Sequence, residues 1–233
     1  MNIYKFKANK DYKRLKFFLL DIGLSHTTIK NLSKELGLVK MNGKSIVMND
    51  KVVKNSIIEI CYKEFQSNEI VQTYRNLNIA YEDEYFLIVY KEHNIATIPS
   101  YCNYKNSLAN FVTFYMKQKD TSFVYRAVNR LDKETSGFIL ICKDAVIYNL
   151  LNIDKVQKKY EVITVGKLKK CKINKKIAST KNEDNRNNIM REIDEQNGKN
   201  AQTIVTKTKY NKNSNTTYAQ IKILSGRTHQ IRV

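Results

Sequence analysis

The side chains best suited to chemistry lie in one short polar segment, residues 129–137, which reads Asn-Arg-Leu-Asp-Lys-Glu-Thr-Ser-Gly. It places the guanidinium of Arg130 two residues before the carboxylate of Asp132, and an apolar run follows at residues 138–142. A polar loop that leads directly into a buried strand is a common position for catalytic residues. A single Asp in a turn more often forms or caps that turn, and spacing alone favours this structural interpretation.

The composition narrows the classes of partner. The chain has 233 residues, enough for one or two domains with a substantial core. Its 41 Lys and Arg residues outnumber 22 Asp and Glu residues, which gives a formal net charge of +19. An excess of this size favours a polyanionic partner, nucleic acid first and an anionic membrane surface second. A compositional bias toward Lys, Asn and Ile would produce the same excess, so charge alone does not establish RNA binding.

Several classes of protein are disfavoured. Residues 1–10 lack the apolar core of a signal peptide, and no apolar run approaches the roughly 20 residues that span a bilayer. The four cysteines include no Cys-x-x-Cys pair and the three histidines are far apart. Neither a disulfide framework nor a metal site is therefore expected. We expect a cytoplasmic protein that binds no metal.

The first 64 residues have the pattern of a small αα-β module. Apolar residues at helical spacing, each run ended by a glycine, predict helices over residues 15–22 and 25–36. Asn42-Gly43 between apolar-rich arms predicts a hairpin over 38–47, and residues 57–62 predict a further strand.

This order of elements is similar to the RNA-binding module named after ribosomal protein S-four. The resemblance rests on Arg14-Leu15 with Phe18-Leu19, on Ser25-x-x-x-Ile29-Lys30 and on Val39-x-x-Asn42-Gly43. It implies that the second helix and the hairpin face RNA, where lysines contact phosphates and supply affinity rather than sequence choice. A solvated surface lysine is an equal alternative for each candidate. The candidates are Lys30, Lys34, Lys40 and Lys44.

The remainder is expected to be a polar linker, residues 65–75, and a second domain, residues 76–233. Residues 169–200 are rich in Lys, Asn and acidic residues with few apolar anchors, so a loop-rich excursion is expected there, with a short strand or helix as the alternative for part of it. The other elements predicted in this domain are a hairpin over 77–91, helices over 107–117 and 144–151, and strands over 138–142, 160–166, 203–210 and 217–224.

Four segments in this second domain resemble the RluA family of RNA pseudouridine synthases, in an RluD-like arrangement with the N-terminal module. They are Tyr-Glu-Asp at 81–83, Arg-Leu-Asp-x-x-Thr-Ser-Gly at 130–137, Lys-x-Tyr at 158–160 and Gly-Arg-x-His-Gln-Ile-Arg at 226–232. The resemblance implies an α+β fold with a mixed, mainly antiparallel sheet and flanking helices. Glu92 and Asn94 stand where the family has Pro and Gly. Relatives continue beyond the third signature, so a C-terminally truncated catalytic domain is expected.

The resemblance implies isomerisation of uridine to pseudouridine in structured RNA, a reaction that needs no cofactor. Large-subunit ribosomal RNA is the first expected substrate and transfer RNA the second. Asp132 would be the catalytic residue, attacking the sugar, attacking the base or abstracting a ribose proton. A guanidinium would keep its carboxylate ionised, with Arg232 as first choice and Arg227 as second. Arg130 would help to displace the target base from its stack, or form a salt bridge with Asp132.

The family pattern also implies how the base is held. Tyr160 would stack on the flipped uracil and take the proton from carbon 5, whereas without the resemblance a core aromatic is the favoured interpretation. Ile231 would pack beneath the base, and Thr135 belongs to the substrate-binding set. A monomer is expected. The alternative is a non-catalytic RNA-binding or ribosome-assembly protein, which would follow from an incomplete catalytic domain. A membrane-surface protein is disfavoured because the sequence shows no helix with a wide apolar face beyond those that the core needs.

Overall fold

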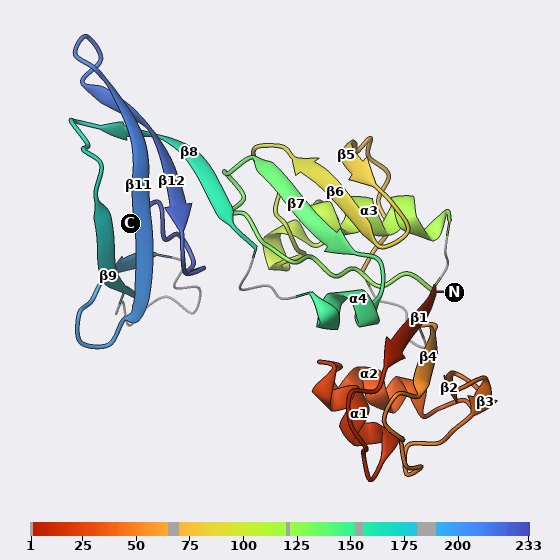
Figure 1. Ribbon diagram of the computed structural model, residues 1–233. Coiled ribbons are helices and arrows are strands. Elements are labelled where there is room, and N and C mark those ends of the chain that lie inside the picture. Colours follow the sequence, from red (N-terminus) through yellow and green to blue (C-terminus); the bar gives the residue numbers. More distant parts are fainter. Residues whose placement is uncertain (1, 65–69, 120–121, 152–155, 181–189) are drawn as a thin grey trace. The chain divides into compact units, whose positions relative to one another are not determined.

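The computed structural model describes residues 2–64, 70–119, 122–151, 156–180 and 190–233 (Figure 1). The chain divides into two compact units, residues 1–152 and residues 153–233. Short helices accompany three sheets with antiparallel strand pairing, so the predicted α+β class is confirmed. The predicted boundary at residues 65–75 stays a prediction, and its first five positions lie outside the described residues.

The N-terminal module contains the two predicted helices and a four-stranded sheet of order β1-β4-β2-β3. The Ser25 hydroxyl caps the second helix by accepting from the Thr28 N–H at 3.2 Å. Asn42 and Gly43 have φ values of +50° and +82°, as the predicted Asn-Gly turn requires. The elements are β1 (Asn2–Lys7), α1 (Leu15–Asp21), α2 (His26–Leu32), β2 (Val39–Met41), β3 (Lys44–Ser45) and β4 (Ile57–Tyr62).

Two features of the module differ from prediction. Helix α2 ends at Leu32 instead of residue 36, because the chain turns at Ser33, whose hydroxyl donates to the Lys30 carbonyl at 2.8 Å. Strand β1 was not predicted. Its exposed positions carry Ile3 and two lysines, and only Tyr4 is buried, so its alternation is weak in sequence. It is held by antiparallel pairing along the whole of β4.

The rest of the first unit is built on a three-stranded sheet of order β5-β6-β7. Phe111 and Val112 of the helix α3 are buried in one cluster with Leu87 and Val89 of β6 and Ile139 of β7. The predicted 77–91 hairpin and both predicted helices are confirmed. The elements are β5 (Asn78–Glu82), β6 (Phe86–Lys91), the 3-10 helix η1 (Tyr101–Asn103), α3 (Leu108–Lys117), β7 (Gly137–Cys142) and α4 (Ala145–Leu150).

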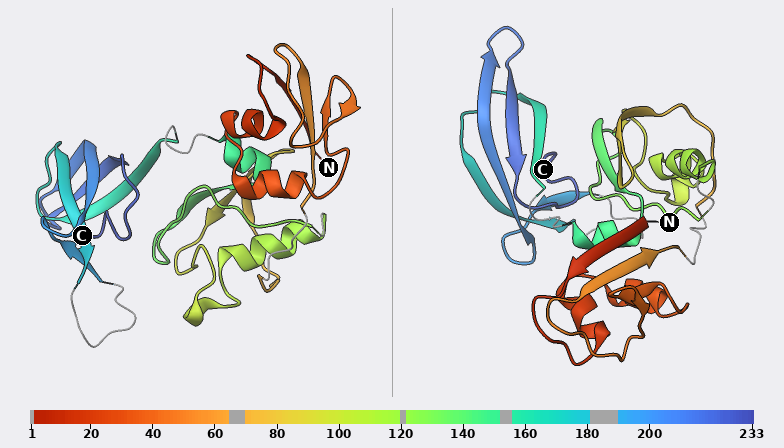
Figure 2. Two further views of the ribbon diagram at one scale, coloured as in Figure 1. Left: turned by 90° about the horizontal axis from the view of Figure 1, so that it is seen from below. Right: turned by 45° about the vertical axis from the view of Figure 1, so that its right-hand side comes forward.

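Helix α4 joins the core of the N-terminal module (Figure 2). Its Ala145 and Val146 belong to the same buried cluster as residues of α1, α2 and β4. Asp144 caps α4 by accepting from the Ile147 N–H at 3.0 Å, and its other oxygen accepts from the Asn2 amide at 2.9 Å and from the Tyr4 hydroxyl. Burial and this carboxylate raise the pKa of Tyr4, so the hydroxyl stays a donor.

The second unit is one five-stranded antiparallel sheet of order β10-β9-β11-β12-β8. Its small core gathers Val205, Ala219 and Ile221, with Tyr160 and Ile231 packed against them. The predicted strands over 160–166, 203–210 and 217–224 are confirmed. The elements are β8 (Lys158–Val165), β9 (Lys172–Ser179), β10 (Arg191–Ile193), β11 (Lys199–Asn211) and β12 (Thr216–Ile223).

The described part of the 169–200 segment contains more strand than the expected loop-rich excursion with a short strand or helix. Strand β9 pairs with the first half of β11 and with β10. Only Ile177 of β9 is buried, so backbone hydrogen bonding rather than an apolar face defines this strand, and periodicity could not reveal it. Residues 181–189 lie outside the described residues. No helix in the parts of the chain described here is long and apolar enough to cross a membrane.

The Asp144 network predicts how firmly α4 holds the module. Asp144→Ala removes the helix cap and leaves the Tyr4 hydroxyl and the Asn2 amide without their acceptor. We expect the free energy of unfolding to fall by about 2–4 kcal/mol in urea denaturation followed by circular dichroism. The control is Asp11→Ala, because Asp11 accepts a single backbone N–H, from Lys54, on the surface. Equal losses in the two variants would contradict a special role for Asp144.

Candidate active site

The loop that carries Asp132 begins as a strand-like partner of β7. The Val128 N–H donates to the Leu140 carbonyl at 2.7 Å. The side chain of Asn129 continues the hydrogen bonding to β7. Its amide nitrogen donates to the Phe138 carbonyl and its amide oxygen accepts from the Leu140 N–H, both at 2.9 Å. Asn129 therefore fixes the start of the loop against the buried strand.

The middle of the loop is held by one hydroxyl. The buried Thr97 side chain donates to the Leu131 carbonyl at 2.6 Å and accepts from the Leu131 N–H at 3.1 Å. Both backbone groups of the residue before Asp132 are thus fixed. The Thr135 N–H donates to the Asp132 carbonyl at 3.1 Å, which closes the turn after it. The sequence argument did not identify Thr97, because nothing local to it marks a partner 34 residues away.

A buried ammonium lies behind the same loop. Lys91 is fully buried, and its Nζ donates to the carbonyls of Ile95 at 2.6 Å and of Glu92 and Lys133 at 3.1 Å. One of these carbonyls belongs to the residue that follows Asp132, so Lys91 ties this loop to the turn after β6. Burial lowers the pKa of Lys91 to about 8, against the opposing influence of the Glu134 and Asp132 carboxylates.

Lys91 was missed as a site residue, although the sequence contains a signal for it. In β6 the inward positions are Leu87, Val89 and Lys91, and the first two are fully buried. A lysine in register with buried residues has to find acceptors inside the fold.

The three site residues expected in this loop differ in exposure. Asp132 and Thr135 are half-buried, whereas Arg130 is exposed. Gly137 at the end of the loop has a φ of +142°, and a Cβ there would lie 3.2 Å from Leu131 Cδ1. The loop therefore closes through a backbone conformation that favours glycine.

Four further expected site residues lie in the second unit. Tyr160 is on β8, opposite Ile221 of β12, and it packs with Ile231 against the same small core. Arg227 and Arg232 are exposed on the turn after β12. The Arg227 Nε donates to the Asn200 carbonyl at 2.9 Å. The structure therefore gathers Tyr160 and Ile231, while a pairing of Asp132 with either arginine stays a prediction.

The turn that carries both arginines is fixed by Gln230. Its amide nitrogen donates to the Gln202 carbonyl at 3.0 Å and to the Thr203 hydroxyl at 3.1 Å. Its amide oxygen accepts from the Ser225 hydroxyl at 3.0 Å and from the Arg227 N–H at 3.1 Å. All four hydrogen-bonding positions of the amide are occupied. Sequence reasoning missed Gln230, because a glutamine in a polar turn gives no local sign of its partners.

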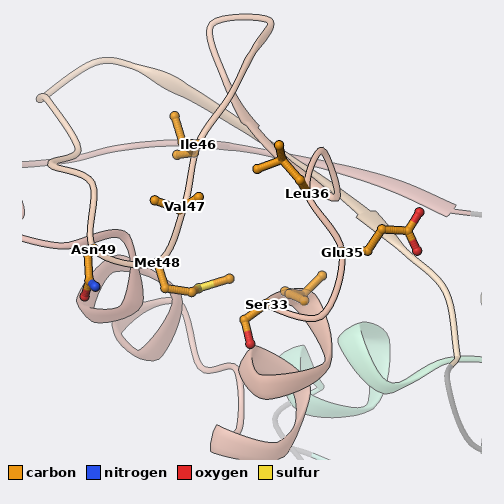
Figure 3. A pocket seen from close by; sticks show the side chains of 8 residues that line it. Ser33, Glu35, Leu36, Ile46, Val47, Met48 and Asn49 are labelled. Carbon is orange, nitrogen blue, oxygen red and sulfur yellow. The ribbon is translucent and has the colours of Figure 1, made fainter.

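The N-terminal module presents its four candidate lysines on α2, just after it, and on the β2–β3 hairpin. Lys30, Lys34 and Lys44 are exposed, and Lys40 is half-buried. A cavity of about 300 Å³ also opens in this module (Figure 3). Its only ionisable side chain is Glu35, which pairs with Lys63, so it offers no catalytic group. Within the described residues, no three His, Cys, Asp or Glu side chains are grouped as a metal ion would require.

Comparison with known proteins extends this picture. The family model described as RNA pseudouridylate synthase matches residues 85–233. The chain belongs to the RNA pseudouridylate synthase family. The match includes the 130–137, 158–160 and 226–232 segments, whereas the 81–83 segment lies before it.

Similar curated proteins carry related names. The chain is 30% identical over 205 residues to an uncharacterized RNA pseudouridine synthase, YhcT of Bacillus subtilis. This match covers 84% of this chain and 65% of YhcT. It is 30% identical over 243 residues to an uncharacterized RNA pseudouridine synthase of Aquifex aeolicus, covering 99% and 75%. It is 33% identical over 152 residues to the ribosomal large subunit pseudouridine synthase D of Blochmanniella floridana, covering 61% and 47%.

The fold is also similar to a solved structure, human RNA pseudouridylate synthase domain containing 4. The TM-score is 0.51 at 17% identity, over 67% of this chain and 62% of the human chain. The chain thus spans slightly less than two thirds of the length of this structure and of YhcT.

The buried ammonium leads to a first prediction for the site. Lys91→Met keeps a linear side chain but leaves three carbonyls without their donor, so we expect a stability loss of about 2–4 kcal/mol. Hydrogen exchange followed by mass spectrometry should show faster exchange over residues 131–135. The control is Lys143→Met, which removes a lysine that bonds Glu82 and the Asp83 carbonyl instead. Unchanged exchange over 131–135 in Lys91→Met would contradict the role of Lys91.

The lowered pKa of Lys91 also predicts a pH dependence. Between pH 8 and 10.5 the unfolded chain keeps this proton while the folded chain loses it, so stability rises with pH through this group. We expect the difference in unfolding free energy between wild type and Lys91→Met to grow in favour of wild type over that window. Denaturation curves at intervals of pH test this, and other titrating groups cancel in the difference. A constant or shrinking difference would contradict the lowered pKa.

Proposed function

We propose that this protein converts uridine to pseudouridine in structured RNA, with large-subunit ribosomal RNA as substrate and Asp132 as the catalytic residue. The observation that carries the proposal is the family match over residues 85–233, which includes the loop of Asp132 and the turn of Arg232. The name of the Blochmanniella relative supports the choice of ribosomal RNA. Transfer RNA is the second substrate class to test.

The reaction begins at an ionised Asp132. The carboxylate is half-buried, and the fully buried Lys91 ammonium lies behind the same loop, where it donates to the Lys133 carbonyl. The carboxylate acts as nucleophile or base while the glycosidic bond breaks, the uracil turns and its carbon 5 joins the ribose. Because atoms are only rearranged within one nucleotide, no cofactor is required.

The target uridine must leave its stack to reach Asp132, at a cost of a few kcal/mol. Arg130 is exposed at the start of the loop and assists this displacement from the flank of the carboxylate. Thr135, in the turn that closes on the Asp132 carbonyl, contributes to the substrate pocket. Tyr160 stacks on the flipped uracil and removes the proton from carbon 5, with Ile231 beneath the base.

Arg232 is the guanidinium proposed to pair with Asp132. Arg227 is the alternative, and its Nε donates to the Asn200 carbonyl of β11. The N-terminal module adds affinity through phosphate contacts at its four candidate lysines, Lys30, Lys34, Lys40 and Lys44. A monomeric state and a cytoplasmic location belong to the same proposal.

Asp132→Asn is the decisive substitution. It removes the charge with little change of volume, so we expect pseudouridine formation to fall by at least about 10³-fold while RNA affinity stays near that of wild type. Tritium release from RNA labelled at carbon 5 of uridine measures turnover, and filter binding measures affinity.

Glu134→Gln is the matched control, because it removes a carboxylate two positions further along the same loop. It should keep turnover within a few-fold of wild type. Residual turnover in Asp132→Asn would overturn the assignment of Asp132. RNA binding by the wild-type chain without any tritium release would instead favour the alternative of a non-catalytic RNA-binding protein.

A further inference from the structure

An aromatic loop stands beside the loop of Asp132. Between β6 and α3, residues 98–104 expose three large apolar side chains: Tyr101 at 100%, Tyr104 at 58% and Ile98 at 41%. A tyrosine with its whole surface in solvent makes no contribution to the core. Exposed aromatic residues gathered on a short segment commonly mark a contact with a partner.

The two loops are mechanically connected. Thr97 directly precedes the aromatic loop, residues 98–104. Its hydroxyl bonds both backbone groups of Leu131, the residue before Asp132. At its other end the Asn110 amide donates to the Tyr104 carbonyl at 3.0 Å. Tyr101 is four residues from Thr97, so the chain cannot carry its Cα more than about 14 Å from that anchor. A ligand on Tyr101 is thus within a few nucleotides of a base at Asp132.

The charge of the segment identifies the kind of partner. Residues 93–119 contain no Asp or Glu, although the chain has 22 of them, and the exposed Lys105 lies next to Tyr104. A positively charged segment with exposed tyrosines combines the two features used to bind single-stranded nucleic acid, attraction to phosphates and stacking on bases. An acidic protein surface would satisfy the charge but would leave the fully exposed ring without a specific role.

We propose that Tyr101 stacks on an unpaired base that flanks the target uridine, with Tyr104 and Lys105 contacting the same strand. This inference rests on the proposed function, because it concerns the RNA that is presented to Asp132. Stacking uses the face of the base rather than its edges, so this contact adds affinity without selecting the neighbouring nucleotide. It also offsets the cost of unstacking when the adjacent uridine is displaced.

The absence of tryptophan from the chain allows a direct test. Tyr101→Trp in the Asp132→Asn background places a single indole on the loop of a protein that does not turn over its substrate. Titration with a short uridine-containing single-stranded RNA, and with large-subunit ribosomal RNA, should quench its fluorescence along the same curve as binding measured by anisotropy. Tyr81→Trp is the control, since Tyr81 is half exposed on the edge strand β5, which β6 separates from β7. Its fluorescence should change little.

Affinity measurements complete the test. Tyr101→Ala should weaken RNA binding by about 5- to 100-fold, whereas Tyr101→Phe should bind like wild type, because the ring and not the hydroxyl stacks. In turnover, Tyr101→Ala should raise KM and leave kcat near wild type. Circular dichroism should show unchanged stability for a residue this exposed.

The outcomes separate this inference from the proposed function. Quenching by RNA, together with no tritium release by the wild-type chain, would keep the stacking site and remove the enzymatic assignment. RNA binding by anisotropy without quenching, or equal affinities of Tyr101→Ala and wild type, would overturn the stacking site. A fluorescence response to ribosomal proteins but not to RNA would assign the loop to a protein contact and overturn it equally.

Discussion

The arrangement around Asp132 depends on one buried cation. The Lys91 ammonium is fully buried, and it donates to three backbone carbonyls drawn from two loops. Burying it is costly, as its lowered pKa shows. This cost is offset because the Lys91 ammonium holds the Lys133 carbonyl, directly after Asp132, and places a positive charge near the Asp132 carboxylate. Thr97 fixes the backbone before Asp132, so Asp132 is held from both sides by side chains remote in sequence.

Those anchors mark the limit of prediction from sequence. The helices, the Asn-Gly turn and the strands with a clear apolar face were predictable because their signals are local, periodic or set by turn chemistry. Asp132 was selected because the short contiguous pattern around it resembles a family signature, and its catalytic role stays a prediction. Thr97 and Gln230 were not selected, since their roles depend on partners more than twenty residues away. The bounds of strand β9 were not predictable for a related reason. Its hydrogen-bonding partner, β11, is remote in sequence, and its own residues carry little apolar signal.

The N-terminal module shows how one residue can link two levels of structure. Asp144 is the cap of α4 and also the acceptor for two side chains of β1. An N-cap preference explains a carboxylate at this position, but only the fold explains its burial. Because Ala145 and Val146 complete the core of the module, α4 belongs energetically to the module while it follows directly on the strand that starts at the Asp132 loop. The four candidate RNA-binding lysines and the Asp132 loop thereby share one compact unit.

The two loops expected to perform chemistry are stabilised by side chains of different charge, and the difference has a physical reason. The Asp132 loop carries the carboxylate that the proposed reaction uses, and its anchor, Lys91, is a cation. The turn after β12 carries Arg227 and Arg232, and a lysine anchor there would repel both guanidinium groups. The neutral amide of Gln230 satisfies two donors and two acceptors without adding charge. A lysine in place of Gln230 would have no acceptor for the Ser225 hydroxyl and the Arg227 N–H, and a glutamine in place of Lys91 would bring no positive charge to the Asp132 loop.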